Sequence, residues 1–229
     1  MKAVILAAGV GKRMLPLTQD IPKPLIKIGN QPILDYIFDA LPEEIDTVIM
    51  VVGYLENRVR MHLGSRYQGK KIRYVRQEEL TGTATALLTT QDLFQKNERF
   101  ILIYGDELPT AGEIKGCLDK EYSWLCCKSS NPKQSGIADI DKTGKILQVI
   151  EKPENPTSDM SAAGIMVINS SIFNYPLVQH DNGEYYLTEL MSGFIRDNDV
   201  YAVYGRQRPP FLSADEVNKI DPIRLTIIE

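Results

Sequence analysis

Apolar residues recur along the first half of the chain in short continuous runs that alternate with stretches of helical spacing. Continuous runs such as Val48–Val52 are typical of strands that are covered on both faces of a sheet. We expect strands at about residues 2–7, 46–52, 72–77, 99–104 and 123–128. Between them, apolar residues three and four positions apart predict helices over 33–41, 59–63 and 84–88. This alternation predicts a doubly wound α/β sheet that binds ligands at the carboxyl ends of its strands.

The second half of the chain has a different pattern, with more turn residues between its strands. Residues 136–140 and 146–151, joined by a turn, are predicted to form a hairpin. Strands over 163–168 and 200–204 and a helix over 186–196 are expected to follow. No linker divides the chain, so we expect one domain over 1–229, with a mixed, mainly parallel, Rossmann-like sheet and a smaller β-rich portion.

Composition narrows the class of protein. The 229 residues are 43% hydrophobic, enough for a full core, and carry a net charge of −4. This negative balance argues against nucleic-acid binding. The opening apolar run is too short for a membrane span and lacks the layout of a signal peptide. Three cysteines without Cys-x-x-Cys spacing favour a reducing compartment, so we expect a cytoplasmic protein with no membrane partner.

Glycines and two cations follow the first predicted strand. Gly9 and Gly11 let the backbone bend tightly and bring its N–H groups close to phosphate oxygens. Arg13 and Lys23 can neutralise the remaining phosphate charge. A Gly-x-Gly loop alone is a weak signal, because an ordinary strand-to-helix turn also explains it. Together with the two cations and Pro22–Pro24, the loop favours a nucleoside triphosphate.

Two other phosphate-binding loops are disfavoured. The dinucleotide motif needs a third glycine where Met14 stands, which argues against a Rossmann-type dehydrogenase. Residues 64–70 resemble a Walker A loop, but Lys71 replaces the required Ser or Thr and the segment follows a predicted helix. We interpret 64–70 as a surface turn.

Polar residues after the third predicted strand suit a nucleobase. The amide of Gln77 offers a donor and an acceptor together, which fits the imide edge of a pyrimidine. Gly82 permits close backbone approach, and Thr83 can cap the helix that follows. A polar loop with a helix cap would give the same pattern without any ligand.

The fourth predicted strand ends on an acid. Gly105 and Asp106 follow the apolar run 100–104, and a carboxylate in this place can hold Mg²⁺ beside phosphates. An exposed acid at a strand end is also common without any ligand. We expect the next residue, Glu107, to face solvent. Trp124, in another strand-like run, is expected in the core.

These motifs resemble the signature of the sugar-phosphate nucleotidylyltransferases. The resemblance rests on Leu-Ala-Ala-Gly-Val-Gly-Lys-Arg-Met at 6–14, Pro-Lys-Pro-Leu at 22–25 and Gly-Glu-Tyr-Tyr-Leu-Thr at 183–188. The sequence is most similar to the uridylyltransferase domain of the bifunctional N-acetylglucosamine-1-phosphate uridylyltransferases. The resemblance implies the nucleotide-diphospho-sugar transferase fold. It also implies a mainly nucleotide-binding half, 1–110, and a mainly sugar-binding half, 111–229.

The resemblance also implies roles for individual positions. The implied catalytic residues are Arg13, Lys23 and Asp106. The implied nucleotide contacts are Leu6, Ala7, Ala8, Gly9, Gly11, Lys12, Gln77, Gly82, Thr83, Tyr104 and Gly105. The implied sugar contacts are Gly136, Glu151, Lys152 and Gly164, while Mg²⁺ is expected on Asp106 and Asn218. Asp215 is a rival for the second metal ligand, because other branches of the family use an acid there.

One departure from the family pattern concerns the sugar. Ala162 stands where the similar enzymes have an asparagine that contacts the sugar, which puts N-acetylglucosamine in question. The acetyltransferase part of the bifunctional enzymes has no counterpart in these 229 residues.

The expected activity is Mg²⁺-dependent transfer of a nucleoside monophosphate to a sugar 1-phosphate, with release of pyrophosphate. UTP is favoured as the donor and dTTP comes second. One alternative is a cytidylyltransferase that acts on a sugar phosphate or on a small alcohol phosphate such as phosphocholine. Another is a catalytically silent relative that binds nucleotide sugars as a regulatory subunit. The expected partners are the triphosphate, the sugar 1-phosphate and a possible second copy of the chain.

Overall fold

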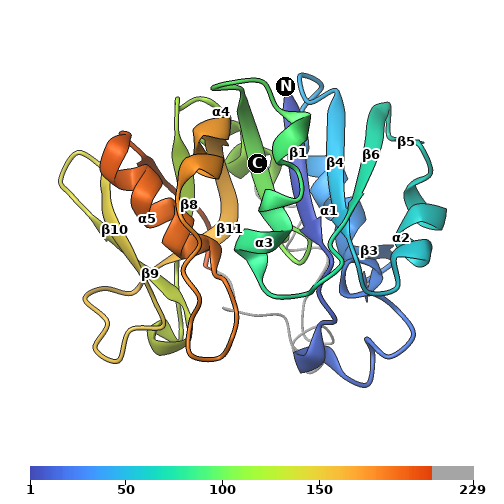
Figure 1. Ribbon diagram of the computed structural model, residues 1–229, viewed down its shortest axis with the longest axis horizontal. Helices are drawn as coiled ribbons and strands as arrows, with labels where there is room; N and C mark the ends of the chain where they lie inside the picture. Colours follow the sequence, from blue (N-terminus) through green and yellow to red (C-terminus); the bar gives the residue numbers. More distant parts are fainter. Residues whose placement is uncertain (208–229) are drawn as a thin grey trace.

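The first half of the chain forms the parallel part of a ten-stranded sheet (Figure 1). The computed structural model describes residues 1–207. Four parallel strands lie in the order β7-β1-β4-β6, and the short β5 pairs antiparallel at the edge. Their bounds are β1 Lys2–Ala7, β4 Thr47–Val52, β5 Arg66–Tyr67, β6 Lys70–Arg76 and β7 Arg99–Tyr104. The predicted doubly wound arrangement is confirmed.

Strand register brings the carboxyl ends of these strands to one edge. Leu6 pairs with Tyr104 on one side and with Val51 on the other, and Val52 pairs with Arg76. The loops that follow β1, β6 and β7 therefore start side by side, which is where a doubly wound sheet binds its ligands.

The second half of the chain adds a mostly antiparallel part to the same sheet. β11 runs antiparallel to β7 and also pairs with β8 and β9, while β9 and β10 form the predicted hairpin. β12 lies parallel to β8. The bounds are β8 Ser123–Lys128, β9 Gly136–Ile140, β10 Ile146–Glu151, β11 Met160–Asn169 and β12 Tyr201–Tyr204. Against β8, the register of β11 shifts between Ala162 and Met166.

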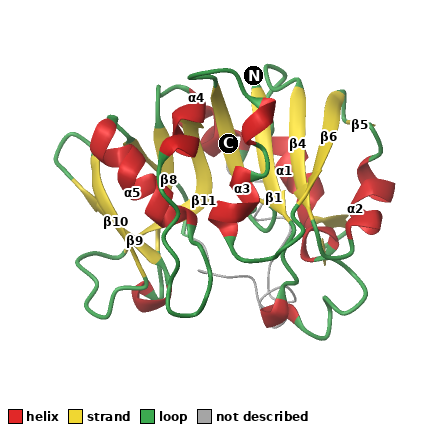
Figure 2. Cartoon of the chain, in the orientation of Figure 1, coloured by secondary structure: helices red, strands yellow, loops and turns green. Residues whose placement is uncertain are grey.

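Helices cover both faces of the sheet (Figure 2). Alternate residues of β1 point to opposite faces, Val4 and Leu6 to one core and Ala3, Ile5 and Ala7 to the other. The first core is shared with α3 (Thr83–Leu88) and α5 (Leu187–Asp197). The second is shared with α1 (Ile33–Ala40), α2 (Glu56–Leu63) and α4 (Ala111–Leu118).

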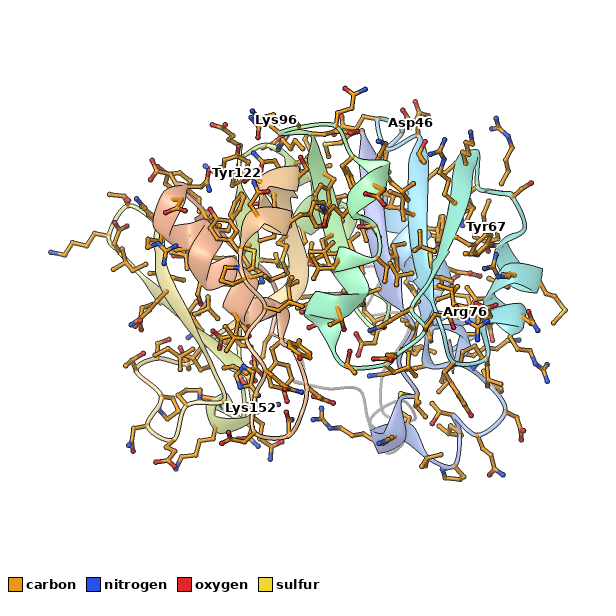
Figure 3. All side chains as sticks on the ribbon, in the orientation of Figure 1. Asp46, Tyr67, Arg76, Lys96, Tyr122 and Lys152 are labelled. Carbon is orange, nitrogen blue, oxygen red and sulfur yellow. The ribbon has the colours of Figure 1, made fainter. Side chains whose placement is uncertain are left out.

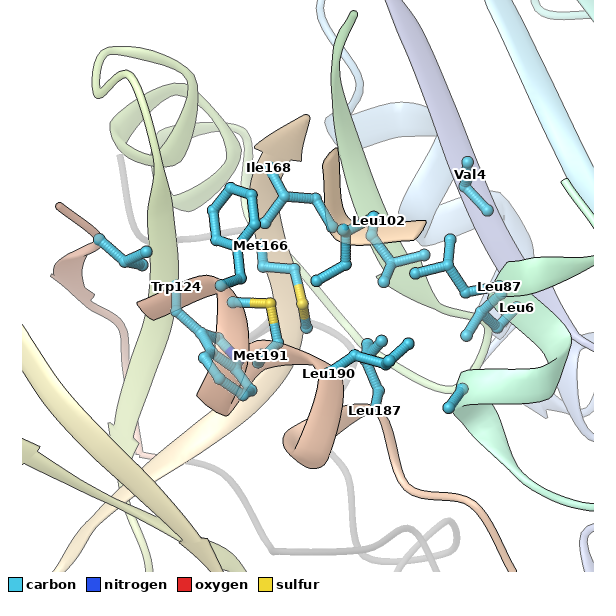
Figure 4. Close-up of a cluster of buried hydrophobic side chains, with 14 of the residues drawn as sticks. Val4, Leu6, Leu87, Leu102, Trp124, Met166, Ile168, Leu187, Leu190 and Met191 are labelled. Atoms are coloured by element: carbon cyan, nitrogen blue, oxygen red, sulfur yellow. The ribbon is translucent and has the colours of Figure 1, made fainter. Parts of the chain in front are cut away.

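The core beneath α5 joins the two parts of the sheet. Figure 4 shows Trp124 of β8, Met166 of β11 and Met191 of α5 in this cluster. Trp124 is only 2% exposed, so its predicted place in the core is confirmed. Cys126 and Cys127 are also buried on β8.

Short elements complete the described chain. They are the 3-10 turns η1 Lys12–Met14, η2 Lys23–Leu25, η3 Gln91–Leu93, η4 Pro132–Gln134 and η5 Ser170–Asn174, with the small β2–β3 pair at Lys27–Ile28 and Gln31–Pro32. Residues 64–70 form the surface turn of the β5–β6 hairpin, as predicted, up to Lys70, which begins β6 and is buried. The Lys70 ammonium donates to the carbonyls of Pro42 and Ile45. Within residues 1–207, no helix has the length and apolar character needed to cross a membrane.

Candidate functional site

The loop after β1 is shaped by two glycines in different ways. Gly11 has φ 69°, and a Cβ there would lie 3.0 Å from Thr18 Cγ2 and 3.1 Å from Lys23 Cβ. The Thr18 hydroxyl donates to the Gly11 carbonyl at 3.0 Å, which closes the loop around η1. Gly9 is exposed, and a Cβ there would meet nothing within 4 Å. The loop is thus packed on the Lys23 side and open above Gly9.

A cation and an acid meet at this open end of the sheet. The Lys23 ammonium, on η2, lies 2.5 Å from Asp106 Oδ2, beyond the end of β7. The Lys23 side chain is 15% exposed and that of Asp106 is 35% exposed, so solvent reaches the pair. The structure therefore brings together two residues that are 83 positions apart in sequence. Lys12 and Arg13 are exposed on η1, in the same loop.

The Gln77 amide is held in one orientation. Gln77 follows β6 and is only 6% exposed. Its Nε2 donates to the Gly82 carbonyl at 3.1 Å and to the Thr85 hydroxyl at 3.0 Å. A carbonyl can only accept, so the atom beside Gly82 O must be the NH₂ group. Because both amide hydrogens are engaged by Gly82 and Thr85, the Gln77 amide is left with Oε1, an acceptor.

Gly82 is required by a close approach between distant segments. Its φ is 128°, and a Cβ there would lie 2.3 Å from the carbonyl oxygen of Tyr185. The amide of Ala84 donates to that carbonyl at 3.0 Å, and the amide of Tyr185 donates to the Thr81 carbonyl at 2.8 Å. The loop after β6 is therefore hydrogen-bonded directly to the segment that precedes α5.

The predicted helix cap at Thr83 is wrong. Gly82 occupies the N-cap position of α3, and no side chain caps that helix. The Thr83 hydroxyl instead accepts from the amide of Leu187, the first residue of α5, at 3.0 Å. Thr83 thus provides an acceptor for a free N–H group at the start of α5, a helix of the other half of the chain, and not at the start of α3.

Tyr104 lies where the two halves of the site meet. Burial is the main cause that raises the pKa of Tyr104, with smaller contributions from Glu151, Asp106 and Glu107, so its hydroxyl remains protonated at neutral pH. That hydroxyl shares a hydrogen bond with Thr83. The neighbouring Gly105 is buried, and its amide donates to the carbonyl of Leu6 at 2.8 Å.

The residues predicted to contact the sugar form a second group. Gly136 pairs with Glu151 across the β9–β10 hairpin, and a Cβ on Gly136 would lie 3.3 Å from Glu151 Oε2. The Thr188 hydroxyl donates to the same oxygen at 3.4 Å. The Lys152 ammonium lies 3.5 Å from Glu151 Oε1 and donates to the Tyr186 hydroxyl at 3.2 Å.

This second group lies at the same edge of the molecule as the carboxyl ends of the parallel strands. Figure 3 shows Lys152 at the edge opposite Asp46 and Lys96, which precede the amino ends of β4 and β7. The Lys152 ammonium also lies 4.5 Å from the centre of the Tyr186 ring. The structure therefore places both groups of predicted site residues at one edge of the sheet.

The predicted solvent exposure of Glu107 is wrong. Its Oε1 accepts the amide of Gly164, on β11, at 2.6 Å. Gly164 itself is needed because a Cβ there would lie 2.4 Å from Tyr104 Cγ. Sequence reasoning missed Glu107 because its partner is 57 residues away and no local pattern marks the contact.

The second metal ligand cannot be compared with the fold. Asn218 and its rival Asp215 both lie outside the described residues, and Asp106 is the predicted ligand that the structure places. Within residues 1–207, no three His, Cys, Asp or Glu side chains gather as a metal cluster would require.

Comparison with known proteins identifies the family. The model of the nucleotidyl transferase family matches residues 2–208, so the chain belongs to this family. The resemblance seen in the sequence motifs is therefore confirmed at the level of the family, and the protein belongs to a class of nucleotidyltransferase enzymes.

Two curated relatives illustrate the similarity. The chain is 35% identical over 211 residues to the UTP–glucose-1-phosphate uridylyltransferase AglF of Haloferax volcanii, which covers 86% of this chain and 84% of that protein. It is 30% identical over 207 residues to the bifunctional protein GlmU of Methanocaldococcus jannaschii, which covers 89% of this chain and 49% of that protein. The chain thus spans about half the length of the bifunctional relatives that it matches.

Solved structures share the fold. A structure assigned as a glucose-1-phosphate thymidylyltransferase from Bacillus anthracis superposes with a TM-score of 0.83 at 24% identity, covering 100% of this chain and 97% of that one. A UDP-glucose pyrophosphorylase structure has a TM-score of 0.79 at 20% identity, covering 90% of this chain and 91% of that one. The predicted mixed, mainly parallel α/β sheet is therefore confirmed.

Proposed function

We propose that the protein transfers a nucleoside monophosphate from a nucleoside triphosphate to a sugar 1-phosphate. The observation that carries this proposal is the Lys23–Asp106 pair, 2.5 Å apart at the carboxyl edge, beside the Gly9–Gly11 loop. An oxygen of the sugar phosphate attacks the α-phosphorus of the triphosphate. The new P–O bond forms as the bond to the β-phosphate oxygen breaks, and pyrophosphate leaves with that electron pair.

The chain's own residues would act by position and charge. A phosphate monoester is already a nucleophile, so little proton transfer is needed. The backbone of Gly9–Lys12 and the Arg13 side chain hold the triphosphate, and Lys23 steadies the α-phosphate and the sugar phosphate. Arg13, Lys23 and Asp106 are all present, which argues against a catalytically silent regulatory relative.

The donor set fits Mg²⁺. Asp106 offers a hard carboxylate oxygen at a partly exposed strand end, the kind of ligand that Mg²⁺ prefers. Asp106 and Asn218 would hold the ion, with Asp215 as the rival of Asn218. When bound, Mg²⁺ neutralises charge on the reacting phosphates. EDTA is expected to stop turnover, and added Mg²⁺ to restore it.

The Gln77 orientation supports a uracil or thymine base. Gln77 presents Oε1, an acceptor, because Nε2 is engaged by Gly82 and Thr85. Uracil and thymine carry an N–H at N3, whereas cytosine carries an acceptor there. A buried acceptor facing another acceptor is costly, so CTP is disfavoured. We therefore propose UTP or dTTP as the donor, which places the cytidylyltransferase alternative below both. The similarity of the motifs to the uridylyltransferases favours UTP first and dTTP second.

The sugar group fits a hexose 1-phosphate. Glu151 can accept from sugar hydroxyls, Gly136 can supply backbone contacts and Lys152 can approach the phosphate. Ala162 belongs to the same side of the sheet as Tyr104 and Tyr185, and it lacks the amide that the similar enzymes use. We propose that glucose 1-phosphate is accepted at least as well as N-acetylglucosamine 1-phosphate.

Pyrophosphate release tests the activity. The purified chain is incubated with UTP and Mg²⁺ and, in separate reactions, with glucose 1-phosphate, N-acetylglucosamine 1-phosphate, galactose 1-phosphate or phosphocholine. The proposal predicts pyrophosphate and a stoichiometric nucleotide sugar with at least one sugar 1-phosphate. Two outcomes would contradict the proposal: pyrophosphate release with phosphocholine but with none of the sugar 1-phosphates, or no release with any of the four acceptors.

A further inference from the structure

One peptide unit in β11 is held at both ends by side chains. The carbonyl of Ala163 accepts from the Trp124 indole Nε1 at 2.6 Å. The amide of Gly164, in the same peptide unit, donates to Glu107 Oε1 at 2.6 Å. Backbone groups within strands normally pair with a neighbouring strand, so two side-chain partners on one peptide unit mark an exception.

This peptide unit lies where β11 passes from one neighbouring strand to another. Residues 165–169 pair with β7, whereas Ser161 pairs with β9. β8 pairs with β11 on both sides of the peptide unit, at residues 160–162 and 166–167, with a register shift in between. The ladder with β7 stops at Ile165, opposite Ile103, and Gly164 lies one position beyond it. The Glu107 carboxylate therefore replaces a strand partner at the fork between the parallel and antiparallel parts of the sheet.

The two ends of this contact belong to different halves of the site. Glu107 follows Asp106 directly, at the end where the nucleotide is proposed to bind. Gly164 lies against the Tyr104 ring and two residues after Ala162, in the proposed sugar pocket. A carboxylate that binds a backbone amide forms a charge-assisted hydrogen bond, which is stronger than a neutral one.

We propose that Glu107 is a positioning residue that fixes the Ala162–Gly164 segment against the nucleotide end of the sheet and so sets affinity for the sugar 1-phosphate. This inference rests on the proposed function, because it takes the acceptor site to lie beside this segment. Glu107 touches neither substrate and acts through the Gly164 amide. Loss of its carboxylate leaves that amide without its partner and lets the peptide unit turn.

Substitutions at Glu107 and at a matched glutamate separate positioning from general stability. Glu98 precedes the opposite end of β7, and its Oε2 also accepts a backbone amide, that of Gln95, at 2.8 Å. Glu107→Ala removes the acceptor, and Glu107→Gln keeps a neutral one. Glu98→Ala removes a comparable bond to a backbone amide, together with the ion pair between Glu98 and Lys2, far from the site. For each, we would measure the KM for glucose 1-phosphate, the Kd for UTP by calorimetry and the melting temperature.

The expected pattern is specific to the sugar. Glu107→Ala raises the KM for glucose 1-phosphate by about tenfold or more, the scale of a lost bond to a charged group, while the Kd for UTP stays within about twofold. Glu107→Gln recovers most of the loss. Glu98→Ala lowers the melting temperature without changing either substrate parameter. An unchanged KM in Glu107→Ala, or an equal change in the KM and the Kd for UTP, would overturn the proposal.

Hydrogen exchange tests the contact between Glu107 and Gly164 independently of the proposed function. If the unmodified protein binds UTP but turns over no sugar 1-phosphate, the proposed function fails, and that failure shows in the unmodified protein alone. Exchange at the Gly164 amide is then compared between the unmodified protein and Glu107→Ala. Faster exchange in the variant supports the tie between Glu107 and Gly164, and equal exchange contradicts it regardless of activity.

Discussion

In the parallel half of the sheet, three of the four strands carry candidate site residues directly beyond their carboxyl ends. Gly9 follows β1, Gln77 follows β6 and Asp106 follows β7. In the antiparallel half, Glu151, Thr188 and other site residues lie on separate elements and meet only through long-range contacts. The comparison teaches that a parallel sheet assembles a site by register, whereas the other half needs specific bonds to hold its pieces together.

Besides the β11–β7 ladder and the shared core, a small number of specific contacts connect the two halves of the candidate site. The Thr83 hydroxyl holds the start of α5, Gly82 packs on the Tyr185 carbonyl and Glu107 holds the amide of Gly164. Changes on the parallel side are therefore expected to affect charge and base recognition. Changes at the junction, the contacts of Thr83, Gly82 and Glu107 between the two halves, are expected to affect stability and the position of the sugar-binding segments.

The largest expected effect concerns charge in the parallel half. Lys23→Ala removes a cation that lies 2.5 Å from Asp106 and is proposed to face the reacting phosphates. Loss of such a contact costs about 3–4 kcal/mol, or roughly 100- to 1000-fold in kcat/KM. Arg13→Ala is expected to act in the same direction. The measurement is steady-state pyrophosphate release, with circular dichroism to confirm folding.

Lys27→Ala is the matched control, because Lys27 is exposed on β2 close to η2. Its kcat/KM should stay near that of the unmodified protein. If a folded Lys23→Ala variant keeps its kcat/KM, Lys23 takes no part in the mechanism. The claim that the parallel half of the sheet acts through charge would then be contradicted.

The next effect concerns the junction. Gly82→Ala places a Cβ 2.3 Å from the Tyr185 carbonyl at φ 128°, so both the backbone and the contact must shift. The combined strain and overpacking should lower the free energy of unfolding by about 4 kcal/mol. Gly64→Ala, at φ 59° and ψ −149° with nothing within 4 Å of the new Cβ, has backbone strain without the clash and should cost about 2 kcal/mol. Urea denaturation measures both, and equal costs would show that the Tyr185 contact contributes nothing.

A smaller effect concerns the base. Gln77→Ala removes the acceptor proposed for the N3–H of the base and should lower kcat/KM for UTP by about tenfold. The UTP-to-CTP ratio should fall with it, because the group that distinguishes the bases is gone. Gln148→Ala, which removes an exposed side chain bound to Asp139, should leave that ratio unchanged. A constant ratio in Gln77→Ala would assign base choice to other residues.

The smallest effect concerns the sugar pocket. Ala162→Asn restores the amide that the similar enzymes carry and should shift the kcat/KM ratio toward N-acetylglucosamine 1-phosphate. One hydrogen bond of about 0.5–1.5 kcal/mol gives a shift of a few-fold up to about tenfold. The proposal fails if the unmodified protein already prefers the acetamido sugar more than tenfold, or if the substitution leaves the ratio unchanged.

The same contrast explains what could be predicted from sequence. The four parallel strands were predicted within about two residues, because buried strands are continuous apolar runs. Helix α4 was missed, since Gly112 and Gly116 weaken its helical signal, although the Thr110–Glu113 capping box marks its start. That capping box is the local signal that could have found it.

The contacts at the junction were not predictable. The Thr83 hydroxyl bonds to a residue 104 positions away, and the Glu107 carboxylate to one 57 positions away. Neither contact follows from a local pattern, because each joins residues that only the folded sheet brings together. Local motifs predict candidate site residues that follow a single strand. They do not predict contacts between elements that are far apart in the sequence.

Steady-state competition among nucleoside triphosphates tests the central claim most directly. UTP, dTTP, CTP, ATP and GTP are mixed at equal concentrations with Mg²⁺ and one accepted sugar 1-phosphate, and the nucleotide sugars are separated and counted. The orientation of Gln77 predicts UTP and dTTP well ahead of CTP. The resemblance to the uridylyltransferases predicts UTP before dTTP, with ATP and GTP far behind. A preference for CTP, ATP or GTP would contradict both the base assignment and the proposed assembly of the parallel half of the site.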